Sequence, residues 1–222
     1  MDIHLFVMSY LIQLLASVIL LYRVLSVKSI YGLSIDTQIC ILAATISRCI
    51  WSINTRIVES DILVATVASL ELLLSLGASV FLFGLFRKLS HTTTVGAPLA
   101  CSAIILVPAA FLLALIFNPG ASFVVTSQTM VAFTMYVEAL ALIPQLWIIR
   151  KMDDVEALTS HYIGLLVVSR IARMMFWLVM FSNGQGFMSL FLADVVHTIL
   201  SGDYLYLWVR KLRYGGRLVY SI

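Results

Sequence analysis

Long apolar runs constrain this chain more than any other feature of its sequence. A helix that crosses the hydrocarbon core of a bilayer needs about 20 mostly apolar residues, because that core is about 30 Å thick and an α-helix rises about 1.5 Å per residue. Seven stretches meet or approach this length, at residues 5–25, 38–53, 62–86, 97–117, 122–149, 162–181 and 187–209. We therefore predict an all-α membrane protein in which seven transmembrane helices form a single domain over residues 1–222.

The composition supports this prediction and excludes several other classes of protein. Hydrophobic residues make up 62% and charged residues 11% of the chain, against about 45–50% and about 25% in ordinary globular domains. A soluble domain of this size could not bury so much apolar surface. Disordered chains, disulfide-stabilised secreted scaffolds and nucleic-acid-binding modules are excluded as well. The three cysteines all fall within predicted spans and show neither a disulfide framework nor a metal-binding spacing.

Lysine and arginine fall almost entirely on one side of the predicted spans. Ten of the 14 lie on that side, only Arg56 lies on the other, and three lie within spans. Because cytoplasmic connections are enriched in positive charge, we predict a lumenal N-terminus and a cytosolic C-terminus. The ten residues, Arg23 among them, are expected to form a solvated cytosolic fringe rather than a nucleic-acid site. The basic run with Arg210, Lys211 and Arg213 is also a candidate contact for anionic lipid or a coat protein.

A second group of charges is predicted to lie near the middle of the bilayer. Counting along the spans gives six residues a similar depth: Arg48, Arg170, Arg173, Glu71, Glu138 and Asp194. A charge in the bilayer core costs about 2.5–3.5 kcal/mol on insertion scales, so three unpaired arginines would offset the stability of a whole domain. The arginines are therefore expected to pair with the carboxylates or to face a water-filled cavity. Internal ion pairs that only hold the helices together are the alternative interpretation, above all for Glu71 and Asp194.

Helical spacing places some of these residues on shared faces. Arg170, Arg173 and Trp177 are three and four residues apart, so they share one stripe of their helix. A stripe of arginine and tryptophan suits a ligand with a carboxylate and an apolar body, because a guanidinium can bind a carboxylate through two hydrogen bonds. Arg48, on another span, is a further candidate for binding the carboxylate.

The chain also matches itself weakly at an offset of about 125 residues. Gln13 in the first span corresponds to Glu138 in the fifth, and with a short slip Arg48 in the second corresponds to Arg170 in the sixth. An even number of spans separates the partners, so the repeats are predicted to be parallel. The expected parts are two three-helix bundles, a linker helix and a basic cytosolic tail, at 1–86, 122–209, 97–117 and 210–222. A ligand site is expected between the bundles, near the midplane.

The most specific motifs lie in the segment 136–170, YVEALALIPQLWIIRKMDDVEALTSHYIGLLVVSR. This segment resembles the ER lumen protein-retaining receptors, the KDEL receptors, which show Tyr-x-Glu, Ile-Leu-Pro-Gln-Leu, Glu-x-x-Thr-Ser-His-Tyr and an arginine at these positions. Pro144-Gln145 is also the pattern of the PQ-loop and SWEET-like transporters. The resemblance implies seven helices of SWEET-like topology and a receptor rather than an enzyme. Such a receptor binds the C-terminal tetrapeptide of escaped lumenal proteins in the Golgi and returns them to the ER in COPI vesicles.

The resemblance also implies roles for single residues. Arg48 would hold the terminal carboxylate of the signal. Arg170 and Glu138 would form the polar pair that rearranges with binding, and Trp177 would line the site. Asp203 would be the last-span aspartate needed for retrograde transport, and the basic tail would bind the coat.

Several positions depart from the family pattern. The first-span histidine that the family links to pH sensing is Gln13 here, and glutamine cannot titrate. Trp51 replaces an acidic residue one turn after Arg48, and Arg173 stands where the family has a tyrosine. These departures imply a receptor that reads a different tetrapeptide, or a paralogue that no longer reads one. If binding depends on pH, the candidates for the titrating group are His197, His4 and Glu138.

Two other function classes are alternatives to a receptor. A SWEET/PQ-loop-like transporter of a small solute is the alternative, although SWEET-like sugar sites usually lack a cluster of arginines. An intramembrane hydrolase lacks support, because the sequence has no paired aspartates on adjoining helices and no Gly-x-Ser-x-Gly motif. The expected partners are lumenal C-terminal peptides, the COPI coat and membrane lipid, at the ER and Golgi membranes. No nucleic acid, cofactor or metal is expected.

Overall fold

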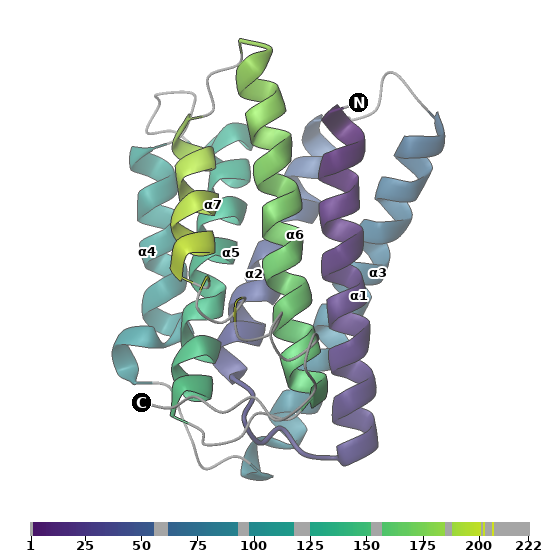
Figure 1. Cartoon of the computed structure of the whole chain (residues 1–222), viewed down its shortest axis with the longest axis vertical. Coiled ribbons are helices and arrows are strands. Elements are labelled where there is room, and N and C mark those ends of the chain that lie inside the picture. Colours follow the sequence, from purple (N-terminus) through teal and green to yellow (C-terminus); the bar gives the residue numbers. More distant parts are fainter. Residues whose placement is uncertain are drawn as a thin grey trace.

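The computed structural model describes residues 2–55, 62–92, 98–117, 125–151, 157–184 and 188–200, together with 202 and 206. Seven α-helices follow one another in these residues: α1 (Asp2–Val27), α2 (Ile35–Thr55), α3 (Ile62–Lys88), α4 (Ala103–Ile116), α5 (Ser127–Arg150), α6 (Ala157–Ser182) and α7 (Met188–Leu200). Two short 3-10 helices, Ser90–Thr92 and Leu99–Cys101, lie between α3 and α4. The helices stand side by side in one bundle (Figure 1). Within the described residues the prediction of an all-α chain is confirmed.

Four stretches of helix are long and apolar enough to cross a membrane: His4–Val27, Ile62–Lys88, Ser127–Ile149 and His161–Ser182. The apolar helix α4 is shorter, with 14 residues. The 21-residue helix α2 contains Arg48 and many polar side chains, which explains why it does not qualify by composition. Large apolar side chains cover much of the outside of the bundle, as expected for a membrane protein.

The helices pack in a pattern that occurs twice. Helix α3 contacts both α1 and α2, and α7 contacts both α5 and α6. We call α1, α2 and α3 the first trio and α5, α6 and α7 the second trio. The two trios meet where α1 packs against α6 and where α2 packs against α5, and Figure 1 shows α6 standing beside α1. Helix α4 packs against α5 and α2. If α1 corresponds to α5 and α2 to α6, the contact of α1 with α6 corresponds to the contact of α5 with α2. This two-fold pattern is the one expected of parallel repeats.

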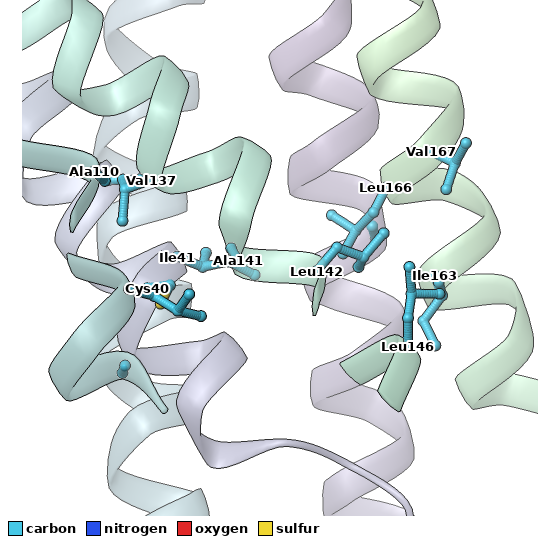
Figure 2. Packing of buried hydrophobic residues seen from close by; sticks show 14 of the residues in the cluster. Cys40, Ile41, Ala110, Val137, Ala141, Leu142, Leu146, Ile163, Leu166 and Val167 are labelled. Atoms are coloured by element: carbon cyan, nitrogen blue, oxygen red, sulfur yellow. The ribbon is translucent and has the colours of Figure 1, made fainter. Parts of the chain in front are cut away.

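The apolar core of the bundle is built largely around α5. Figure 2 shows Ile41 of α2 beside Ala141 of α5, and Leu146 of α5 pointing toward Ile163 of α6. All four side chains are buried in one continuous cluster. Pro144 lies inside α5, and the helix continues through it to Arg150.

The connection between α1 and α2 is held by a side chain of α5. Gly32 has a positive φ of 76°, a conformation that favours glycine, and its carbonyl accepts a hydrogen bond from Nε2 of Gln145 at 2.8 Å. Oε1 of the same glutamine accepts from the backbone N–H of Ser34, also at 2.8 Å. Gln145 thus joins the loop between α1 and α2 to the last turns of α5.

Gln145→Leu is expected to destabilise the protein by removing both of these hydrogen bonds. A buried backbone group left without a partner costs about 1–3 kcal/mol, so the thermal unfolding midpoint in detergent should fall by several degrees. Trp147→Leu is the matched control, because it changes a more exposed side chain of the same helix. Equal midpoints for the two variants would contradict the stabilising role of Gln145.

Arg23 also supports the loop after α1. Its guanidinium donates to the backbone carbonyls of Ser29 at 2.8 Å and Tyr31 at 3.0 Å. The side chain is only 2% exposed. The prediction that it belongs to a solvated fringe is therefore wrong, because loop carbonyls rather than water satisfy this guanidinium.

The ends of α1, α3 and α5 lie together at one end of the bundle. The backbone N–H of Ile30, after α1, donates to Oγ1 of Thr92, after α3, at 3.1 Å. The contact of Gln145 with Ser34 brings the end of α5 to the same place. The basic residues at these three helix ends are thus gathered on one side, as the charge pattern predicted.

Candidate functional site

The charged residues predicted for the midplane form two buried clusters, in which no side chain is more than 6% exposed. In the first, Nη2 of Arg48 on α2 donates to Oε1 of Glu71 on α3 at 2.8 Å. In the second, Arg170 and Arg173 of α6 pair with carboxylates of α5 and α7. The arginines were expected to pair with carboxylates or to face a water-filled cavity, and each of the three pairs with a carboxylate.

The second cluster joins α5, α6 and α7. Nε and Nη2 of Arg173 donate to the two carboxylate oxygens of Asp194 at 2.8 and 2.7 Å. Its Nη1 donates to Oε2 of Glu138, which also accepts from Nη1 of Arg170. One turn after Arg173, Nε1 of Trp177 donates to Oδ2 of Asp194 at 2.9 Å. The three α6 residues predicted to share a stripe do face one polar network.

The first cluster leaves a donor unused. Oε1 of Glu71 accepts from Nη2 of Arg48 and from the hydroxyl of Ser75. Nε of Arg48 is buried and has no hydrogen-bond partner in the described part of the chain. In Arg173 both Nε and Nη2 bind a carboxylate, whereas in Arg48 only Nη2 does and Nε is left without a partner in the described residues.

Tyr10 of α1 lies between the two clusters. Its ring faces the guanidinium of Arg48, with 3.9 Å between Cζ and the ring centroid, and its hydroxyl accepts from Nη1 of Arg173 at 3.5 Å. One turn along α1, Nε2 of Gln13 donates to Oε1 of Glu138 at 3.4 Å. Sequence reasoning did not select Tyr10, although its spacing of three from Gln13 puts both on one face of the helix.

The ion pairs give a correspondence between residues of the two trios that is more regular than the one from the weak sequence match. Arg48, on the second helix of the first trio, pairs with Glu71 on the third helix, 23 residues later. Arg173, on the second helix of the second trio, pairs with Asp194 on the third, 21 residues later. Arg48 therefore corresponds in its pairing to Arg173, at the same offset of 125 that separates the contacting residues of α1 and α5. The match with Arg170 needed a slip.

Another buried contact crosses between the trios. Nε2 of Gln38 on α2 donates to the hydroxyl of Tyr162 on α6 at 2.9 Å. Tyr162 is the tyrosine of the Thr-Ser-His-Tyr motif, so this motif serves the contact between the two trios.

Some predicted residues lie outside the described part of the chain. His197 belongs to α7, but its side chain is not among those described. The residues predicted to act in trafficking lie outside it altogether: Asp203, Arg210, Lys211 and Arg213. Their roles stay predictions.

Comparison with known proteins agrees with the resemblance of the motifs. The family model described as ER lumen protein retaining receptor matches residues 29–180. The chain belongs to this family. The ER lumen protein-retaining receptor erd-2.2 of Caenorhabditis elegans is 28% identical over 201 residues, which are 90% of each chain. The ER lumen protein-retaining receptor of Drosophila melanogaster is 28% identical over 205 residues, 91% of this chain and 92% of its own.

Other members of the ER lumen protein retaining receptor family match a shorter part of the chain more closely. ER lumen protein-retaining receptor 2 of Homo sapiens is 36% identical over 88 residues, which are 39% of this chain and 41% of the relative. The family match over 29–180 includes Arg48 with Glu71 and Arg170 with Glu138. It ends before Asp194, so the partner of Arg173 on α7 lies beyond the matched segment.

Proposed function

We propose that this protein is a receptor that binds the C-terminal tetrapeptide of escaped lumenal proteins and returns them from the Golgi to the ER in COPI vesicles. Membership of the retaining-receptor family supports this function. The observation that carries the binding step is the buried, unpartnered Nε of Arg48, because a carboxylate is a group that binds guanidinium nitrogens through charge-assisted hydrogen bonds.

The proposed site lies between the two trios. Arg48 binds the terminal carboxylate, Arg170 and Glu138 rearrange with binding, and Trp177 lines the site. Arg173 has its Nε and Nη2 on Asp194 and its Nη1 on Glu138, which supports an indirect role through the network rather than direct binding of the ligand.

We also propose a SWEET/PQ-loop-like arrangement, in which 1–86 and 122–209 are parallel three-helix bundles joined by the helix at 97–117. The helix contacts that occur twice support it. The N-terminus is placed in the lumen and the tail from 210 in the cytosol, where it would bind the coat and anionic lipid. The grouping of basic helix ends on one side supports this orientation.

The binding step predicts a strict requirement for a free C-terminal carboxylate. Purified protein should retain members of a random N-acetylated tetrapeptide library and should not retain the same library with amidated C-termini. In cells, secreted reporters that carry the selected tetrapeptides should be retained when this protein is expressed. Equal binding of the free and the amidated libraries would contradict the role of Arg48.

The same preparation separates a receptor from the transporter alternative. A transporter of a neutral solute would produce flux into proteoliposomes and no dependence on a peptide carboxylate. Carboxylate-dependent binding without solute flux is the result expected here.

A further inference from the structure

We infer that the charge balance of the two buried clusters makes this receptor select C-terminal tetrapeptides whose side chains carry no negative charge. This inference rests on the proposed function, because it assumes that Arg48 binds the terminal carboxylate of a peptide. It adds the chemical class of the side chains of the ligand, which the role of Arg48 alone does not specify.

The two clusters contain equal numbers of positive and negative groups. In the described part of the chain, three arginines and three carboxylates are their charged residues: Arg48, Arg170, Arg173, Glu71, Glu138 and Asp194. Each takes part in an ion pair, so the charges of the clusters sum to zero. A rearrangement of Arg170 and Glu138 on binding would change partners but not this sum. The clusters therefore hold no excess positive charge for an acidic ligand.

The open donor of the first cluster accounts for one carboxylate of the ligand. Among the described residues, Nε of Arg48 is the guanidinium nitrogen that is buried without a hydrogen-bond partner. In the proposed function the terminal carboxylate of the peptide uses this donor. An acidic side chain of the same peptide would bring a further negative charge, and a buried charge without a counter-charge is costly.

The residues that precede the terminal carboxylate lie within reach of the second cluster. Cζ of Arg48 is 3.9 Å from the centroid of the Tyr10 ring, and Cζ of Arg173 is 5.8 Å from the same centroid. The two guanidinium carbons are therefore less than about 10 Å apart, whereas an extended peptide spans about 3.3–3.6 Å per residue. Side chains of a tetrapeptide held by Arg48 can thus approach the charges of both clusters.

The second cluster disfavours an acidic side chain because its arginines already have carboxylates. Nε and Nη2 of Arg173 donate to Asp194, and its Nη1 donates to Glu138. An acidic side chain beside Arg173 would therefore also lie beside these two carboxylates, and like charges placed together weaken binding. A neutral side chain with an N–H or O–H group can instead donate to the carboxylates. Unpaired charge is a general means of rejecting the wrong ligand.

The first test measures the effect of a single negative charge in the peptide. Purified wild-type protein selects members of the random N-acetylated tetrapeptide library with free carboxylates, and Asp and Glu should be depleted before the last residue. A selected peptide is then synthesised with Asp or with the isosteric Asn at each preceding position in turn. At one or more positions Asp should weaken binding at least about tenfold relative to Asn. Equal affinities at every position, or enrichment of acidic residues, would overturn the inference.

Asp194→Asn tests whether the charge balance causes this selection. The substitution removes one negative charge and keeps an oxygen that can accept from Arg173 and Trp177, so the second cluster gains a net positive charge. The ratio of the two affinities, Asn peptide over Asp peptide, should fall toward one. Asp36→Asn is the matched control, because Asp36 binds Ser102 and Ala103 outside the clusters, and it should keep the wild-type ratio.

The outcomes separate this inference from the proposed function. If free carboxylates are required but Asp and Asn peptides bind equally, the receptor function stands and only the selection fails. A wild-type ratio in folded Asp194→Asn would contradict the charge balance as its cause. If wild-type protein does not prefer free over amidated peptides, both fail together. The peptide series on wild-type protein keeps the inference falsifiable even where Asp194→Asn does not fold.

Discussion

Arg48→Gln is expected to lose carboxylate-dependent peptide binding by at least about thirtyfold. Removing one partner of a buried charge pair costs about 2–5 kcal/mol in binding, and here it leaves the peptide carboxylate without the guanidinium. Arg48→Lys should give an intermediate loss, because an ammonium keeps the positive charge but cannot offer two parallel donors. Equilibrium binding of a selected tetrapeptide to the purified protein measures both effects.

The single variant also leaves Glu71 unpaired, so a loss of binding must be separated from a loss of fold. The double variant Arg48→Gln with Glu71→Gln removes both charges and should keep the fold. It should still bind poorly, because the peptide carboxylate has no guanidinium to pair with. A double variant that binds like wild type would exclude Arg48 as the carboxylate ligand.

The sequence predicted carboxylate partners for the midplane arginines because an unpaired arginine in a bilayer is costly. Three arginines in a bilayer need counter-charges, and Glu71, Glu138 and Asp194 were the carboxylates at matching depth. Depth along a helix does not give the direction in which a side chain points. The family resemblance implied the pair of Arg170 with Glu138, whereas the partners of Arg48 on α3 and of Arg173 on α7 follow only from the packing of the helices.

Two departures from the predictions have a common physical cause. The position of Arg23 after a span predicts a solvated side chain, but its guanidinium donates to the carbonyls of Ser29 and Tyr31 in the loop after α1. An isolated tyrosine in an apolar run carries no charge, so the sequence pattern does not point to Tyr10. Arg23 gains its role from backbone carbonyls of the next loop and Tyr10 from arginines of other helices, and counting charges along the chain detects neither contact.

Residues of the family motifs make contacts between the two trios that the sequence did not predict. Gln145 and Tyr162 belong to the Pro-Gln and Thr-Ser-His-Tyr motifs, and each binds across to the first trio. Arg173 departs from the family pattern, and the structure supplies it with a carboxylate on α7. The motifs thus contain residues that join the two trios, whereas Arg173 is a charge of the second cluster that departs from the family pattern.

Arg173→Met is expected to be the most destabilising single substitution in the site. Arg173 is 1% exposed and donates to Asp194 through two nitrogens and to Glu138 through a third. Removing it leaves Asp194 as a buried carboxylate with no arginine, and breaking a buried pair in this way costs about 3–5 kcal/mol. We expect a large fall in the thermal unfolding midpoint in detergent. Arg87→Met is the matched control, because Arg87 is exposed at the end of α3.

The double variant Arg173→Met with Asp194→Leu tests the physical reason. Replacing a whole buried ion pair by apolar side chains of similar volume is often neutral, so the double variant should recover much of the lost stability. Glu138 keeps Arg170 as a partner in this background. A double variant as unstable as the single one would contradict the ion-pair explanation. If the double variant is stable and still binds free-carboxylate peptides, Arg173 serves the packing of α6 against α7, and Arg48 is the arginine that receives the ligand.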